Sequence, residues 1–185
     1  EDDAPERRER LGQRRLEDAQ RRQITGLLAA QDGVSEAIIE RSIRALAASG
    51  IDHTMVIRPP GTPSAVGTKT VHDIRPGHGL LGALLTGLAA ADTPDVLLIG
   101  CHRAPPPPGF LRGLLQWAPR SADVVVPVSD GRSMPIPGLY GHRCLSAIQA
   151  SLLAGELRVD GWWDHVRVFS VPESTWRPTW PDGEP

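Results

Sequence analysis

A chain of 185 residues is long enough for one domain with an appendage and too short for two full domains. Hydrophobic residues make up 40% and charged residues 23%, and these values exclude a fully disordered chain. The formal net charge of -2 lacks the excess of cations with which a general nucleic-acid binder neutralises phosphates, so nucleic acid is not an expected partner.

Cysteine content and hydropathy predict the compartment. Cys101 and Cys144 are too few and too far apart for a disulfide scaffold or a zinc finger. No run approaches the roughly 18 apolar residues of a membrane span, and no signal peptide follows the charged start. We therefore expect a soluble, cytoplasmic protein that does not bind a membrane.

Residues 1–23 carry seven acidic residues and seven arginines with few apolar side chains, a pattern that predicts a solvated, charged helix. Two interpretations stay open: an arm that docks on a partner, or an extension from a preceding domain. We favour the extension.

The next part of the chain alternates strand and helix patterns. Apolar residues predict a strand over 24–30, and helical spacing predicts a helix over 35–50, which ends at a glycine. A short strand follows at 53–58, and a further extended segment is expected at 69–73.

The pattern continues with an apolar helix over 79–91 and a strongly hydrophobic strand over 95–101. The prolines of 105–108 interrupt the chain and are most simply a rigid spacer, although a polyproline recognition segment is the alternative. A short helix is then expected at 110–117 and a buried strand at 123–128.

The remaining elements are an extended segment at 134–140, a helix at 143–154, a strand at 166–171 and a flexible Pro/Trp tail at 174–185. The repeated β-α-β order predicts an α/β fold, with a mostly parallel sheet and helices on both faces, in a single domain over 24–173.

Two apolar runs, 96–100 and 124–126, lack alternation and are expected to be buried neighbouring strands. In a sheet of this kind ligands bind where the strands end at their carboxyl side. The expected site is therefore made by 29–33, 59–61, 73–79, 101–108 and 129–135.

Several segments match one known pattern. They are the opening strand ITGLLAA, the segment HDIRPGHGLLGALLTGLAAA, the strand DVLLIGCH, the segment DGRSMPIPGLY and a late helix that ends in Ala-Gly-Glu. Together they resemble the molybdenum cofactor guanylyltransferases, a family of nucleotidyltransferases, over residues 24 to about 173. The resemblance implies a Rossmann-like nucleotidyltransferase fold, nucleotidyl transfer to molybdopterin, and GTP and Mg²⁺ as cofactors.

The resemblance also implies ligand-binding positions at the matched strand ends and loops. Asp73 keeps the family's carboxylate and is the candidate Mg²⁺ ligand, while no catalytic residue is assigned. The candidate cofactor-binding residues are Ala29, Ala30, Asp73, Gly79, His102, Arg103, Arg132 and Ser170.

The chain departs from the family where the chemistry takes place. The family's glycine-rich phosphate loop ends in Asp-Lys, but here the first strand passes through Asp32 and Gly33 into the next helix, and the only lysine is Lys69. His102 stands where the family has a magnesium-binding aspartate, and neutral imidazole is a poor ligand for that hard cation.

These losses lead to the hypothesis of a non-catalytic relative that binds a ligand or partner, because phosphoryl transfer depends on positioning and charge neutralisation. The alternative is an active nucleotidyltransferase with an unorthodox or partner-completed site. Four arginines are able to hold phosphate: Arg58, Arg75, Arg103 and Arg132.

Two other chemistries compete for the same residues. Cys101 is a possible nucleophile at a strand end, but no cation or helix terminus is evident beside it. A transition-metal site is also possible, although no pair has diagnostic spacing. Its candidate ligands are His72, Asp73, His78, Cys101, His102, His142 and Cys144.

Trp162 and Trp163 either cover the core or form an association surface, and we favour association. We expect a homodimer, or a complex with a partner from molybdoenzyme maturation.

Overall fold

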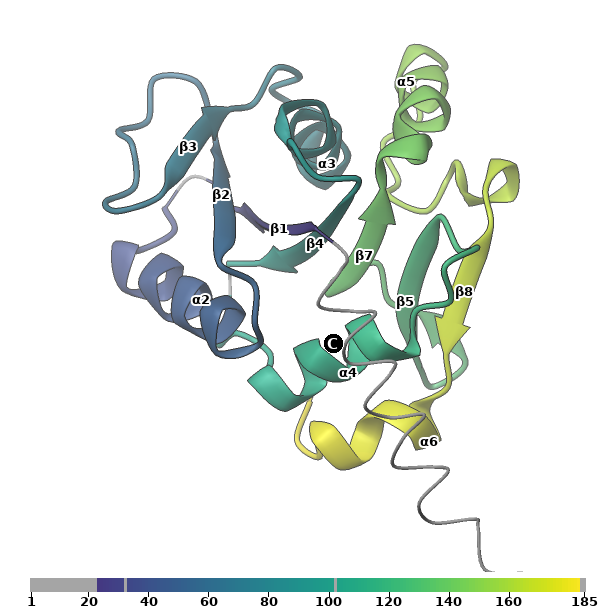
Figure 1. Cartoon of the computed structure of the whole chain (residues 1–185). Coiled ribbons are helices and arrows are strands. Elements are labelled where there is room, and N and C mark those ends of the chain that lie inside the picture. Colours follow the sequence, from purple (N-terminus) through teal and green to yellow (C-terminus); the bar gives the residue numbers. More distant parts are fainter. Residues whose placement is uncertain (1–22, 32, 102, 184–185) are drawn as a thin grey trace, which may run out of the picture.

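The computed structural model describes residues 23–31, 33–101 and 103–183, and the predicted charged helix at 1–23 lies almost entirely outside them. The described strands form one eight-stranded sheet (Figure 1). Its order is β3-β2-β1-β4-β7-β5-β6, with β8 also paired to β5. The predicted α/β fold with a mostly parallel sheet is confirmed.

The first half of the sheet is parallel. The strands β1 (Ile24–Ala29), β2 (His53–Arg58), β3 (Lys69–His72) and β4 (Asp95–Gly100) all run in one direction. The hydrophobic runs of β1 and β4 are buried, as strands covered on both faces require.

The second half contains the strand β5 (Val124–Ser129), the short β6 (Arg132–Ser133), β7 (Gly138–Gly141) and β8 (Val168–Val171). β7 lies antiparallel between β4 and β5, so the expectation that these two buried runs are neighbours is wrong. The chain reverses after β5 at Asp130 and Gly131, which both have positive φ, and the turn leads into β6, which pairs antiparallel with β5. The following segment then places β7 between β4 and β5.

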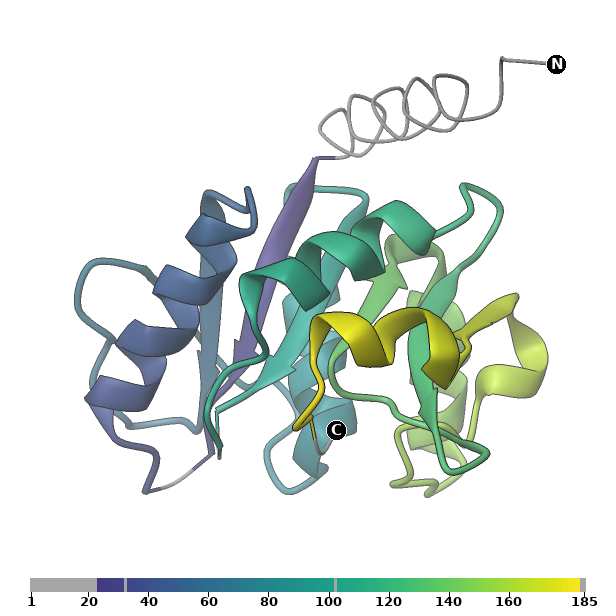
Figure 2. The same cartoon turned by 90° about the horizontal axis from the view of Figure 1, so that it is seen from below.

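Helices cover both faces of the sheet, as predicted, and each face has its own core. On one face lie α3 (Gly79–Ala90), the 3₁₀ turn η1 (His142–Cys144), α5 (Leu145–Leu153) and η2 (Trp163–His165). On the other lie α2 (Glu36–Ala48), α4 (Pro108–Trp117), α6 (Glu173–Trp176) and η3 (Arg177–Thr179). Figure 2 shows α2, α4 and α6 on the same face of the sheet.

Two tryptophans, Trp162 and Trp176, are buried where the sequence predicted an association surface and a flexible tail. Trp162 is only 1% exposed and packs in the core with Tyr140, so the prediction that it forms an association surface is wrong. Trp176, in the predicted tail, is fully buried and meets Phe110 edge to face at 5.9 Å. The segment after β8 therefore contributes to the core.

None of the helices in the described part of the chain is long and apolar enough to cross a membrane.

Candidate functional site

A cavity of about 500 Å³ opens at the carboxyl ends of β1 and β2, beside the first turn of α3. This is the edge of the sheet at which the strand pattern predicts a ligand. The structure brings four of the predicted site residues together there: Ala29, Ala30, Asp73 and Gly79. The remaining wall is made by Gln31, Ile57, Arg58, Pro59, Pro76, Gly77, Leu80 and Ala83.

Asp73 is held in place from two sides. Its Oδ1 atom accepts hydrogen bonds from the Thr86 hydroxyl at 2.9 Å and from the backbone N–H of Arg75 at 2.8 Å. Its own backbone N–H donates to the carbonyl oxygen of Arg58 at 2.8 Å, which joins the Asp73 loop to β2. Thr86 is not among the predicted site residues, because a threonine inside an apolar helix carries no sequence signal of what it contacts.

The loop that precedes α3 packs closely on the helix. A Cβ atom at Gly82 would lie 2.6 Å from the carbonyl oxygen of Arg75 and 3.2 Å from Oδ2 of Asp73, so only glycine fits without movement. Gly79 and Gly77 have positive φ angles of 54° and 86°, which the turn into the helix requires. The first turn of α3 is thereby fixed against the cavity.

Arg58 is the one cation among the described residues that line this cavity. Its side chain is buried and donates hydrogen bonds to a carboxylate oxygen of Glu36 and to the carbonyl oxygen of Pro63. Glu36 lies in the first turn of α2, and its side chain is about half exposed. Arg58 is predicted only as one of four possible phosphate ligands, and Glu36 is not predicted at all, because no sequence spacing links the two residues.

A second cavity of about 340 Å³ lies at the carboxyl end of β4. The predicted site residue Arg103 lines it, together with the prolines at positions 105, 106 and 107. Trp180 and Asp182, from the C-terminal segment, also line it, as do Ile136 and Pro137. Ala29 and Gly100 are partners in the pairing of β1 with β4, so the two cavities flank one pair of strands.

The other predicted site residues lie elsewhere or outside the described residues. Arg132 is in β6 and Ser170 is in β8, where its hydroxyl lies 3.4 Å from that of Ser133, and neither lines the two cavities. His102 lies outside the described part of the chain.

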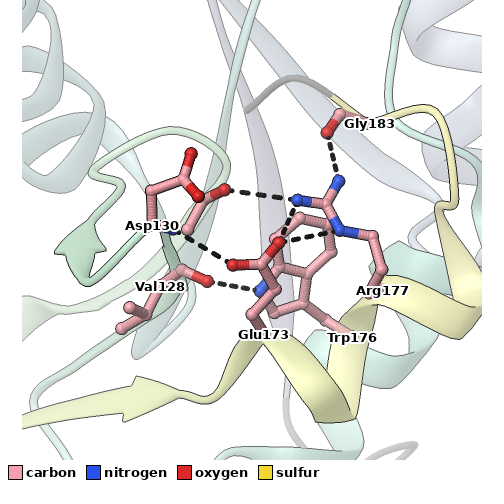
Figure 3. A network of polar contacts seen from close by, with 7 residues as sticks. Val128, Asp130, Glu173, Trp176, Arg177 and Gly183 are labelled. Carbon is pink, nitrogen blue, oxygen red and sulfur yellow. Dashed lines mark hydrogen bonds and ion pairs between the residues drawn. The ribbon is translucent and has the colours of Figure 1, made fainter.

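A polar network holds the C-terminal segment at the end of β5 (Figure 3). The Glu173 carboxylate accepts hydrogen bonds from the guanidinium of Arg177 and from the backbone N–H of Asp130. These contacts hold the pKa of Glu173 below its ordinary value, with Arg177 as the largest cause. Arg177 also donates to the carbonyl oxygen of Gly183 at 2.7 Å, which fixes the segment that supplies Trp180.

The rival chemistries gain no support from the described residues. Burial raises the pKa of the Cys101 thiol to about 11, so the thiolate that a nucleophile requires is disfavoured. Burial likewise raises the pKa of Cys144 to about 12. Within 23–31, 33–101 and 103–183, no three His, Cys, Asp or Glu side chains are placed to hold a metal ion.

Comparison with known proteins places the chain in one family. The model of the MobA-like NTP transferase domain matches residues 26–165. A probable molybdenum cofactor guanylyltransferase of Chloroflexus aggregans is 34% identical over 94 residues, which cover 49% of this chain and 45% of that protein. One of Bacillus licheniformis is 28% identical over 123 residues, which cover 63% of each chain. Both alignments therefore span less than two thirds of the relative's own length.

Solved structures share the fold. Molybdopterin-guanine dinucleotide biosynthesis protein A from Archaeoglobus fulgidus superposes with a TM-score of 0.71 at 12% identity, over 85% of this chain and 88% of that one. The 2-C-methyl-D-erythritol 4-phosphate cytidylyltransferase of Thermus thermophilus gives a TM-score of 0.62 at 21% identity, over 82% and 90%.

Proposed function

This chain belongs to the MobA-like NTP transferase domain family, and from that premise we propose that it binds a nucleotide in the Asp73 cavity without catalysing nucleotidyl transfer. The Asp73 cavity is the one lined by Ala29, Arg58, Asp73 and Gly79 at the ends of β1 and β2.

The observation that carries the proposal is the connection from β1 to α2. β1 ends at Ala29 and α2 begins at Glu36, so residues 30–35 alone join them. Their sequence, AQDGVS, contains one glycine and neither lysine nor arginine. A triphosphate is normally held by successive backbone N–H groups of a glycine-rich loop and by cations in it, and this connection has one glycine and no such cation.

The charges around the cavity support binding rather than transfer. Arg58 is already paired with Glu36, and Asp73 is the only carboxylate among the described residues that line the cavity. A single carboxylate can contribute to a Mg²⁺ ion that is otherwise bound by phosphates and water. Stabilising the charge that develops in phosphoryl transfer needs more positive charge than this site provides.

The lining of the cavity suits the planar, partly apolar part of a nucleotide. Its apolar lining residues are Ala29, Ile57, Leu80 and Ala83, and the Asp73 carboxylate beside them is held by hydrogen bonds. Pockets of this kind bind a ring by apolar contact and orient it with a few fixed polar groups. Asp73 can accept hydrogen bonds from the N–H groups of a base or from ribose hydroxyls.

The second cavity, with Arg103 and Trp180, is the proposed position for a further ligand of the molybdopterin type, which is the acceptor implied by the family resemblance. Self-association, or a complex with a partner protein, also remains a proposal, and Trp162 is not available for either.

Calorimetric titration of the purified chain with GTP and CTP, with and without Mg²⁺, tests the proposal. We expect binding that Asp73→Ala weakens, and no nucleotidyl product when a molybdopterin acceptor is added. Product formation that disappears in Asp73→Ala would instead establish an active enzyme. The absence of nucleotide binding by a folded wild-type chain would overturn the proposal.

A further inference from the structure

We propose that Thr86 is a positioning residue for the Asp73 cavity. Together with the backbone of Arg75 it occupies one carboxylate oxygen of Asp73, so that only the other, Oδ2, is offered to a hydrogen-bond donor of the nucleoside. This inference rests on the proposed nucleotide-binding function and names the atom that recognises the ligand.

Oδ1 of Asp73 has no acceptor capacity left for a ligand. It accepts the backbone N–H of Arg75 at 2.8 Å and the Thr86 hydroxyl at 2.9 Å. A carboxylate oxygen offers about two lone-pair sites, so these two donors fill it. No described residue donates a hydrogen bond to Oδ2. A ligand donor that reaches Asp73 therefore binds to Oδ2.

The Thr86 hydroxyl is itself held in a fixed orientation. Thr86 is 1% exposed, and its oxygen accepts the backbone N–H of Ile74 at 3.1 Å. Its single proton has two acceptors at 2.9 Å, Oδ1 of Asp73 and the carbonyl oxygen of Gly82. An ionised carboxylate is the stronger acceptor, so the proton points to Asp73. The hydroxyl thus fixes the carboxylate to the helix α3.

Asp73 and the cavity lie on the same face of the sheet. Thr86, which holds the carboxylate, belongs to α3. Ile57 and Ala83, which line the cavity, belong to the core that α3 covers. Oδ2 lies close to α3, because a Cβ atom at Gly82 would come within 3.2 Å of it. The free oxygen is therefore on the side of the sheet where the cavity opens.

A free carboxylate oxygen selects the part of the ligand that can approach it. It accepts from N–H and O–H groups and repels phosphate, so the nucleoside end is the part that it recognises. The donor is either a base N–H group or a ribose hydroxyl. These two sources differ in one respect: a hydroxyl can also accept a hydrogen bond, whereas an N–H group can only donate one.

The first test removes the hydroxyl of Thr86. GTP is titrated calorimetrically, with and without Mg²⁺, into the full chain, Thr86→Val and Thr86→Ser. We expect Thr86→Val to bind about tenfold more weakly and Thr86→Ser to stay within about twofold of wild type, since serine keeps the hydroxyl. In an Asp73→Ala background, Thr86→Val should have no further effect, because Thr86 acts through Asp73.

Thr93→Val is the matched control. The Thr93 hydroxyl is also part-buried and bonds to the Thr25 hydroxyl and to the carbonyl oxygen of Asp95, but Thr93 does not line the Asp73 cavity. Its replacement makes the same chemical change and should alter the affinity for none of the ligands.

The second test changes only the atom at the Oδ2 position. In Asp73→Asn, the Arg75 N–H and the Thr86 hydroxyl both require an acceptor, so the amide oxygen takes the place of Oδ1 and the NH₂ group takes that of Oδ2. ITP and 1-methyl-GTP lack a base donor, and 2′-deoxy-GTP and 3′-deoxy-GTP lack a ribose hydroxyl. The recognised donor is the one whose removal weakens binding to wild type but not to Asp73→Ala.

Asp73→Asn then gives a different result for each source. If the recognised donor is a base N–H, Asp73→Asn should bind GTP at least about tenfold more weakly, because two donors face each other. If it is a ribose hydroxyl, Asp73→Asn should stay within about threefold of wild type, because the hydroxyl then accepts from the amide.

The outcomes separate this inference from the proposed function. If GTP does not bind to the folded wild type, the proposed function fails and this inference fails with it. If GTP binds, but Thr86→Val binds like wild type or is equally harmful in the Asp73→Ala background, only the positioning role is refuted. An effect of Thr86→Val that appears only with Mg²⁺ refutes the nucleoside as the recognised part.

Two results would refute the assignment of Oδ2. One is that Asp73→Asn keeps an affinity that depends on a base N–H, since Oδ1 would then be the acceptor. The other is that no analogue distinguishes wild type from Asp73→Ala. Because Asp73→Asn leaves Thr86 intact, these results decide the assignment even if Thr86→Val does not fold.

Discussion

Replacing Trp176 by alanine tests whether the segment after β8 is part of the folded core. Its indole is fully buried, meets Phe110 at 5.9 Å, and donates from Nε1 to the carbonyl oxygen of Val128 at 2.8 Å. Truncation of a buried tryptophan costs about 3–5 kcal/mol. The carbonyl of Val128 is only partly buried, so water can replace the lost hydrogen bond and the total should stay within that range.

Urea unfolding followed by circular dichroism measures this cost. With a slope of about 2 kcal/mol per molar urea, the midpoint should fall by roughly 1.5–2.5 M. Trp176→Phe retains an aromatic ring beside Phe110 and should lose less stability than the alanine variant. Leu153→Ala, at a side chain of a residue that is 83% exposed, is the control and should leave the midpoint almost unchanged. A loss below about 1 kcal/mol in Trp176→Ala would refute the placement of this segment in the core.

Three further changes test the sheet, the site and the ion pairs of Asp123 at the start of β5. Leu98→Asp should abolish the cooperative unfolding transition seen by calorimetry, because it introduces an unpaired charge at a fully buried strand position. Gly82→Ala should lower the free energy of unfolding by about 1–3 kcal/mol and weaken nucleotide binding, since its Cβ would collide with the loop that holds Asp73, while Gly109→Ala, with open space around it, should do neither. Hydrogen bonds from Arg167, assisted by Arg143, hold the pKa of Asp123 below its ordinary value of 3.8, so its contribution to stability is present above that pH and is lost as the pH falls further. The difference in unfolding free energy between wild type and Asp123→Asn should therefore be constant near neutral pH and shrink below about pH 4; a difference that grows in acid would contradict this assignment.

The sequence predicts the strands and helices well where local pattern determines them. The run at 95–101 lacks alternation because β4 is covered on both faces, and this property is visible in composition alone. The place of β7 between β4 and β5 is not visible in this way, because it depends on pairing across a long chain separation after the turn at Asp130. Neither a four-residue strand nor its partner has a sequence pattern that specifies the register.

The candidate site shows the same division between local and long-range information. Asp73 and Gly79 could be predicted because they lie in a matched segment at a strand end. The pair of Arg58 with Glu36 joins residues on different elements, and the hydrogen bond from Thr86 to Asp73 joins a helix to the loop before it. Side-chain contacts of this kind follow from the packing of α2 and α3 on the sheet, which the sequence pattern does not determine.

The features retained around Asp73 favour a binding role over a purely structural one. Thr86 and the backbone of Arg75 fix the carboxylate, and Gly82 leaves no space for a side chain behind it. A scaffold that only presents a surface has no need of an open cavity lined by a carboxylate that two hydrogen bonds hold in place. The connection over 30–35 contains neither lysine nor arginine, and Arg58, already paired with Glu36, is the one cation among the described residues that line the Asp73 cavity. We therefore propose recognition of a nucleotide without its transfer, and the titration with GTP and CTP, combined with the search for a nucleotidyl product, distinguishes the two activities.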